Sequence, residues 1–331
     1  MSTRKKGNDE KPTAGHRRAG RPVSPRKRAE EPEEVPPASF SRMEIEQQMA
    51  DLSKLMADQD FENVDEAKDF LRNLLEDNDG KIPHRQPETA AEKAQELIFE
   101  AIDAPDRRAR KLIKDALKLD PDCVDAYILL GEMADSLPDA IAEFRKAVAA
   151  GERSLGADVF EEDRGAFWGM IETRPYMRAL RSLATSVWNY GEVDEAVQLY
   201  QEILSLNPGD NQGVRYALLD ALLLLRRHDE AAELLDQFDD SMANWAYNEA
   251  LLLFRTEGRS ENAIEALETA LEVNEFVPDY LLGYEPMPDP DEIPDFISFG
   301  DETEAISYVF GAFPLWAATP GAQYWLSEYA E

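Results

Sequence analysis

The residues that are able to do chemistry are few and lie far apart in this chain. The three histidines fall in a basic tail (His16), a polar linker (His84) and a turn between two predicted helices (His228). We therefore expect no catalytic or metal site shared among them. The only cysteine, Cys123, follows Asp120 and Asp122 at the start of a predicted helix. Adjacent carboxylates oppose formation of a thiolate, so this residue is expected to be a packed thiol.

The acidic side chains also lack the spacing of a catalytic or metal-binding motif. Neither Glu161 with Glu162 nor Asp289 with Asp291 matches a calcium loop, and we expect these pairs to be solvated. No glycine-rich loop that would cradle a phosphate is present. We therefore predict a protein that is not an enzyme, with no catalytic or metal-ligating residues and no cofactor.

A set of cationic and aromatic residues suits binding better than catalysis. Arginine presents a planar fork that binds carboxylates through two hydrogen bonds, and tryptophan and tyrosine offer large contact areas at low entropic cost. On one concave surface, such residues would fit a protein or peptide partner, in particular an extended acidic segment or the C-terminus of a polypeptide. The predicted groove residues are Arg174, Arg178, Arg181, Trp188, Asn189, Tyr216, Trp245, Asn248 and Arg255.

An alternative is that these arginines pair with acids of the same protein and hold an insertion in place. The candidate acids are Glu152, Glu161, Glu162, Asp163 and Glu172. The sequence leaves both interpretations open.

The helices that would position these residues belong to a repeated pattern. Ala196, Ala231 and Ala263 lie 35 and 32 residues apart, and similar apolar, aromatic and turn residues recur around each of them. A period of about 34 residues is typical of stacked helix–turn–helix units, each of which shares a core with its neighbours. Two weaker units around Ala109 and Ala140 precede these three.

The repeated residues resemble the tetratricopeptide repeat. The first strong unit carries Leu180, Leu183, Ala184, Val187, Gly191, Ala196, Tyr200, Ile203 and Pro208. The resemblance implies an all-α, right-handed helical solenoid, here over residues 89–277, whose first helices line a concave groove. It does not extend to the repeats that clamp chaperone C-termini, because Thr185 stands where one of their asparagines is expected.

An insertion interrupts the array. Ala140 and Ala196 lie 56 residues apart, which leaves about 22 residues beyond one repeat. We place the insertion at residues 151–173. Phe160, Phe167 and Trp168 make it too apolar for a plain linker. It either packs over the array as a lid or extends the flanking helices and fills a gap between repeats.

Three further segments resemble bacterial tetratricopeptide proteins that are grouped with the suppression-of-tumorigenicity seven family. They are the runs at residues 172–178 (ETRPYMR), 207–213 (NPGDNQG) and 319–322 (TPGA). The resemblance covers the protein from Ala90 to its end. It implies a fold but no reaction.

Charge is distributed very unevenly. Residues 1–28 carry a net charge of +8, and the remaining residues carry −41. Residues 1–38 are too poor in apolar groups to form a core, so we predict a disordered basic tail. Residues 17–22 resemble an AT-hook, although Ala19 stands where that motif needs an arginine. Such a tail suits DNA, RNA or the acidic body of the same protein, and the sequence leaves these open. The tail residues that would contact nucleic acid are Arg17, Arg18, Arg21, Arg26, Lys27 and Arg28.

The ends of the array are predicted to carry additional helices. A helical hairpin is expected at residues 39–80, with a capping box at Asn63 and Glu66, either as a docking element or as a cap on the solenoid. Residues 278–331 combine a Pro/Asp-rich segment with helices that cover the last repeat. Asp301 and Glu304 form a capping box there, and Thr319 is expected to cap the final helix.

No stretch is apolar and long enough to span a membrane, and the N-terminus lacks a secretory core. We therefore expect a cytoplasmic protein with no membrane contact. Its predicted function is that of a scaffold or adaptor that binds a partner segment in the concave groove. The alternative is a nucleic-acid-associated adaptor that is anchored through the basic tail alone.

Overall fold

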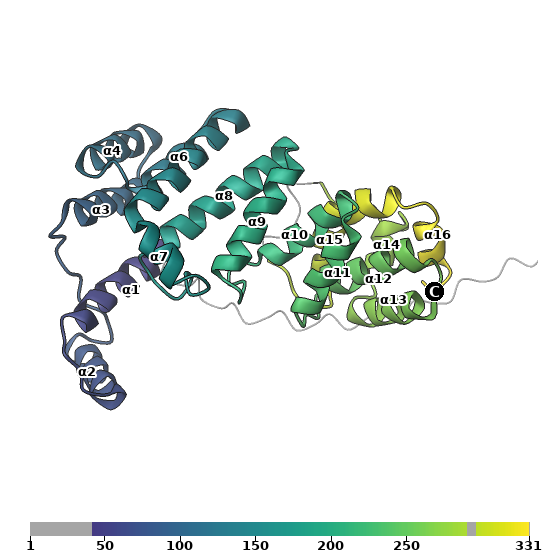
Figure 1. The fold of residues 1–331 in the computed structure, drawn as a ribbon, viewed down its shortest axis with the longest axis horizontal. Helices are drawn as coiled ribbons and strands as arrows, with labels where there is room; N and C mark the ends of the chain where they lie inside the picture. Colours follow the sequence, from purple (N-terminus) through teal and green to yellow (C-terminus); the bar gives the residue numbers. More distant parts are fainter. Residues whose placement is uncertain (1–41, 290–295, 331) are drawn as a thin grey trace, which may run out of the picture. The chain divides into compact units, whose positions relative to one another are not determined.

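A computed structural model describes residues 42–289 and 296–330, which form helices and connecting turns, with no strand among them (Figure 1). The chain enters this region through α1 (Arg42–Ala57) and α2 (Val64–Asp77). The predicted basic tail, including Arg17, Arg18, Arg21, Arg26, Lys27 and Arg28, lies outside the described residues. Its disorder and its binding of nucleic acid therefore stay predictions.

Five helix pairs follow one another along the sequence and form the repeat array (Figure 1). The helices of each pair pack together, and successive pairs meet through contacts such as α6 on α8 and α9 on α10. The predicted helical solenoid is confirmed. The pairs are α3 (Ala90–Ile102) with α4 (Asp106–Leu119), α5 (Val124–Glu132) with α6 (Leu137–Leu155), α8 (Arg174–Tyr190) with α9 (Val193–Leu206), α10 (Val214–Leu224) with α11 (His228–Gln237), and α12 (Ala243–Glu257) with α13 (Glu261–Val273).

Small residues allow the paired helices to approach closely. Ala196, Ala231 and Ala263, whose spacing reveals the repeat, have no exposed surface. At Gly131 in α5, an added Cβ atom would lie 2.4 Å from the Phe144 ring of α6. A larger residue at these positions would force the helices apart, since protein interiors are close-packed.

Local signals fix several helix ends. The side chain of Asn63 accepts hydrogen bonds from the N–H groups of Asp65 and Glu66 at the start of α2. Thr89 and Glu92 form a reciprocal capping box at the start of α3. Each cap satisfies backbone groups that a helix terminus leaves without an intrahelical partner.

The insertion at residues 151–173 contributes to the core. Its first residues extend α6 to Leu155, and the short helix α7 (Ala157–Glu162) follows. The ring of Phe160 lies 5.1 Å from that of Tyr176, and Phe167 is buried with its N–H bonded to the Leu206 carbonyl at 3.2 Å. These contacts match the second interpretation of the insertion, in which it extends a helix and fills a gap between repeats.

The C-terminal helices pack on the last two repeats. They are α14 (Val277–Leu281), α15 (Glu302–Ala317) and α16 (Ala322–Ser327), and α15 contacts α10, α12 and α14. The prediction that Thr319 caps the final helix is wrong. Its hydroxyl donates to the Leu315 carbonyl at 2.7 Å, and α16 begins after Gly321 instead.

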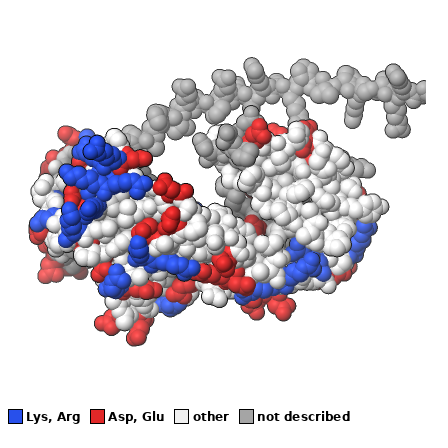
Figure 2. Space-filling view, turned by 90° about the horizontal axis from the view of Figure 1, so that it is seen from above, with Lys and Arg blue, Asp and Glu red and all other residues white. Residues whose placement is uncertain are grey.

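The C-terminal segment also differs from the rest of the protein in charge. Residues 305–327 contain no Asp, Glu, Lys or Arg, although 31% of the whole sequence is charged. Figure 2 shows a broad area without charged side chains over these helices. Within residues 42–289 and 296–330, no helix has both the length and the apolar character needed to cross a bilayer.

Candidate partner-binding surface

One face of α8 carries four of the nine predicted groove residues. We call the set Arg174, Arg178, Arg181, Thr185 and Trp188 the α8 stripe. These residues follow one another at intervals of three or four, which places them on one side of the helix. Helix α8 is the first helix of its pair, and its opposite side is buried in the core. The structure therefore places these five side chains on one face of α8.

Arg178 is occupied by acids of the same protein. Its Nη2 atom donates to Asp125 Oδ2 at 2.8 Å, and its Nη1 atom forms an ion pair with Glu46 of α1. Asp125 is buried and also accepts a hydrogen bond from Gln95 at 3.0 Å. Desolvation alone would lower the pKa of Arg178, but attraction to Asp125 and Glu46 raises it above its usual value.

Arg174 is half-buried under two other segments. Its Nε atom donates to the Trp168 carbonyl at 3.1 Å, and its guanidinium lies 5.5 Å from the centroid of the Trp168 ring. Its Nη1 atom lies 3.5 Å from the Met49 sulfur of α1. The insertion and α1 thus cover this end of the α8 stripe.

For part of the α8 stripe, these contacts decide whether the arginines bind a partner or pair with acids of the same protein. Arg178 does pair within the protein, but its partners are Asp125 and Glu46. No ion pair joins an arginine of the α8 stripe to Glu152, Glu161, Glu162, Asp163 or Glu172, all of which belong to the described residues. The acids that sequence reasoning selected by proximity are therefore not the ones that the fold supplies.

The other half of the α8 stripe is open. Arg181 and Thr185 are exposed and Trp188 is half-buried; Asn189 beside them is exposed as well. A shallow cavity of about 280 Å³ lies here, lined by Phe144, Arg181, Ser182, Thr185 and Ser186. Across the two described ranges, 42–289 and 296–330, Arg181 takes part in no ion pair.

Tyr216 and Trp245 pack against other residues of the same protein. Their rings meet edge to face at 6.0 Å, and Trp245 is 4% exposed. The Tyr216 hydroxyl donates to Asp240 at 2.7 Å, and Arg215 forms ion pairs with both Asp240 and Asp210. These residues join α10 to the turn before α12, so Trp245 is not available to a partner in this structure.

Asn248 and Arg255 are engaged by the C-terminal helix. Asn248 is fully buried (0% exposed); it donates to Asp220 at 2.7 Å and accepts from the Tyr308 hydroxyl at 3.0 Å. Arg255 donates to the carbonyls of Leu223 and Leu315 at 2.7 and 2.8 Å. At this end of the array, α15 lies where the sequence predicted an open groove.

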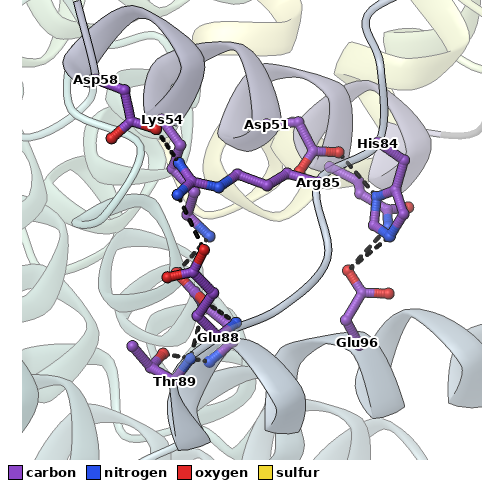
Figure 3. A network of polar contacts seen from close by, with 10 residues as sticks. Asp51, Lys54, Asp58, His84, Arg85, Glu88, Thr89 and Glu96 are labelled. Atoms are coloured by element: carbon purple, nitrogen blue, oxygen red, sulfur yellow. Dashed lines mark hydrogen bonds and ion pairs between the residues drawn. The ribbon is translucent and has the colours of Figure 1, made fainter.

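A polar network fixes α1 on the first repeat (Figure 3). Asp51 bonds His84 at 3.0 Å, Lys54 pairs with Glu92 of α3 at 2.8 Å, and Arg85 pairs with Asp58 at 2.5 Å. His84 thus connects α1 to the linker before α3. The network positions Glu46 and Met49 against Arg178 and Arg174.

A cavity of about 270 Å³ is lined by residues of α1, α3, α5, α6 and α8, with Cys123 in its wall. Burial raises the pKa of the Cys123 thiol to about 12, so the thiol stays protonated near neutral pH. His228 lies far along the sequence at the start of α11, and burial lowers its pKa. In the part of the chain that the structure describes, no three His, Cys, Asp or Glu residues are grouped to hold a metal ion.

Sequence reasoning missed Glu46, Asp125 and Tyr308. Asp125 follows Asp122 by three residues on an acidic helix start, and nothing in that local pattern distinguishes it from its neighbours. Tyr308 was expected in a terminal cap, but its contact with Asn248 spans 60 residues. A signal for Tyr308 does exist, because it lies in the charge-free run at residues 305–327.

Two comparisons with known sequences agree. The model of the family described as ST7 protein matches residues 86–328. The chain is 29% identical over 236 residues to the suppressor of tumorigenicity 7 protein-like of Homo sapiens, which covers 64% of this chain and 40% of that protein. It is 29% identical over 230 residues to the suppressor of tumorigenicity 7 protein of Macaca fascicularis, with coverages of 62% and 42%. The chain thus spans less than half the length of these relatives.

A solved structure is also similar. The tetratricopeptide repeat protein YrrB, described as having an unusual peptide-binding site, shares 22% identity and covers 61% of this chain and 91% of its own, with a TM-score of 0.39. The repeat fold is established by the five helix pairs themselves. Because the family model matches most of its length, the chain belongs to the ST7 protein family.

Proposed function

We propose that this protein is a non-enzymatic protein-interaction scaffold that binds an acidic segment of a partner on the open half of the α8 stripe. One observation carries the proposal. The protein's own α1 already places an acidic side chain, Glu46, on Arg178. Arg181 follows three residues later, about 4.5 Å further along the helix axis. A partner carboxylate at Arg181 would repeat the contact that Glu46 makes.

The residues around Arg181 suit such a partner. An arginine fork binds a carboxylate through two hydrogen bonds, and a partly exposed tryptophan is a common anchor in interfaces. Trp188 and Asn189 supply the aromatic surface and a polar side chain, and the shallow cavity at Ser182 and Thr185 offers room for a small side chain.

The C-terminal helices support a scaffold role in a second way. Phe310 and Tyr324 are 59% and 67% exposed within the charge-free run at residues 305–327. Depletion of charge together with exposed aromatic side chains is typical of the central part of protein interfaces.

The test is affinity capture with the 331-residue chain and two matched variants. Arg181→Glu reverses the exposed cation of the α8 stripe. Lys146→Glu reverses an exposed cation on α6, where Lys146 only pairs with Glu143 of the same helix. We expect a partner that both wild type and Lys146→Glu retain and that Arg181→Glu loses.

Each capture is run with and without nuclease, because the basic tail offers the alternative function. Partners that resist nuclease and depend on Arg181 support the scaffold. Partners that all three proteins retain, and that nuclease removes, would refute the groove proposal and favour the nucleic-acid adaptor.

A further inference from the structure

Helix α4 is strongly basic in an acidic protein. Residues 29–331 hold 25 Lys and Arg against 66 Asp and Glu, yet six of those 25 lie within the 14 residues of α4. All six are exposed, and Figure 2 shows Lys and Arg side chains gathered over the α3–α4 end of the array. The six residues are Arg107, Arg108, Arg110, Lys111, Lys114 and Lys118.

Four of these cations form a single line, which we call the α4 stripe: Arg107, Lys111, Lys114 and Lys118. At about 100° per residue they fall within about 60° of arc, with Arg110 directly beside them. The opposite face of α4, with Ala109, Ile113 and Ala116, is buried in the first repeat. The fold therefore fixes the α4 stripe on the outside of the molecule.

Local acids neutralise only part of this charge. Arg108 pairs with Glu100, Lys118 pairs with Asp115 at 2.6 Å, and Arg110 donates to the Met133 carbonyl at 2.8 Å. Arg107, Lys111 and Lys114 form no ion pair with any residue that the structure describes. The hydrogen bond from Lys118 lowers the pKa of Asp115, and the nearby charges of Lys111 and Lys114 lower it further.

We propose that the α4 stripe is a docking site for a short acidic segment of a partner protein. The stripe is about 17 Å long, from eleven helical steps of about 1.5 Å. Acids flank it along the chain: exposed Asp103 and Asp106 precede Arg107, and half-buried Asp120 and Asp122 follow Lys118. Three or four carboxylates fit between these limits. A longer polyanion would run on into acidic surface, where repulsion opposes binding.

The chemistry of the surroundings also favours a protein segment over nucleic acid. Proteins that bind single strands add aromatic side chains on which bases stack. Between residues 65 and 189, the exposed large apolar side chains are Ile102 and Leu119, and neither is aromatic. They lie at the C-terminal ends of α3 and α4, where they can contact apolar residues that flank a partner's acids.

The site goes beyond the proposed function, because it lies on the second helix of its pair and shares no residue with the α8 stripe. The first measurement is the affinity of a fluorescent tetraglutamate peptide for the 331-residue chain, by anisotropy at two salt concentrations. The stripe variant is Arg107→Gln/Lys111→Gln/Lys114→Gln. The control is Lys68→Gln/Arg72→Gln/Lys146→Gln, which removes three exposed cations elsewhere. We expect at least a tenfold loss for the stripe variant and less than twofold for the control.

The basic tail is identical in all three proteins and could itself bind the peptide. Carbodiimide crosslinking of the peptide to lysines, mapped by mass spectrometry, distinguishes binding at the tail from binding at the α4 stripe. We expect crosslinks at Lys111 and Lys114. We also expect the Arg181→Glu variant to bind the peptide as wild type does. Equal affinities of stripe variant and control, or crosslinks confined to tail lysines, would overturn the proposal. If the stripe substitutions reduced the affinity for a 20-base-pair DNA duplex more than the affinity for the peptide, the α4 stripe would be a nucleic-acid site and the proposal would be overturned. Circular dichroism of each variant confirms that the helices are intact.

Discussion

Replacing Asp220 with asparagine perturbs the contact through which α15 closes the last repeats. Asp220 of α10 accepts hydrogen bonds from Asn248 at 2.7 Å and Asn244 at 3.2 Å. Helix α15 lies against it, since a Cβ atom added at Gly311 would be 3.8 Å from the carboxylate. Desolvation raises the pKa of Asp220 from 3.8 to about 6, although the two asparagine amides partly oppose that rise.

The sign and size of the effect follow from this pKa. The folded protein binds the Asp220 proton more tightly than the unfolded state does, so the stabilisation that this one group contributes is fully present below pH 4 and is lost as pH rises through 6. The whole effect is about 3 kcal/mol, of which roughly half falls between pH 5 and pH 7.5. Asparagine cannot ionise, so the free energy of unfolding of the variant should rise by about 1 kcal/mol relative to that of wild type over that interval.

Urea unfolding at pH 5, 6 and 7.5, followed by tryptophan fluorescence, measures this difference. Trp245, Trp316 and Trp325 are buried in the C-terminal half and report on its unfolding. Asp236→Asn, which changes an exposed acid on α11, is the matched control and should show no such trend. A difference between Asp220→Asn and wild type that stays constant with pH would refute the reasoning.

Three other predictions follow from the packing and the polar contacts. Arg178→Met leaves the buried Asp125 without its cation and should lower the free energy of unfolding by about 3–5 kcal/mol, measured by thermal or urea unfolding; a loss below about 1 kcal/mol would contradict the role of this pair. Gly131→Ala forces a methyl group against the Phe144 ring, so a loss of about 1–3 kcal/mol is expected, and unchanged stability would show that the helices can separate freely. Cys123 should resist iodoacetamide at pH 7.5 in the folded protein and react after denaturation, because its thiol is buried with a raised pKa; rapid labelling of the folded protein would disagree.

The repeat array could be predicted from the sequence because its determinants are local. Each helix pair is encoded by apolar residues three and four apart, and the small residues at Ala196, Ala231 and Ala263 mark the helix crossings. The α8 stripe follows from the same periodicity. Its arginines at positions 174, 178 and 181 fall on one face whatever packs over them.

What covers that face could not be predicted. Glu46 lies 132 residues from Arg178 and is one of 68 acids in the protein, so no local pattern selects it. Trp245 and Asn248 were placed in an open groove because periodicity identifies a helix face but not the distant helix that covers it. Helix α15 covers Asn248 through Tyr308, whereas Trp245 is buried against Tyr216 and Phe238.

The basic face of α4 could have been predicted from the sequence, but the strongly negative total charge drew attention away from it. A division into a +8 tail and a −41 body treats the body as uniformly acidic. The spacing of Arg107, Lys111, Lys114 and Lys118 would have shown an exposed cationic line, given the apolar positions that fix the opposite face.

The central claim is that a partner segment binds beside Arg181 on the open half of the α8 stripe. The most direct measurement places a photo-crosslinking amino acid at Thr185 and, as a control, at Thr269, which is exposed on α13. The account predicts a protein crosslink at Thr185 that Arg181→Glu abolishes and that Thr269 does not give. Crosslinks of the same protein at both positions, or a Thr185 crosslink that survives Arg181→Glu, would contradict it.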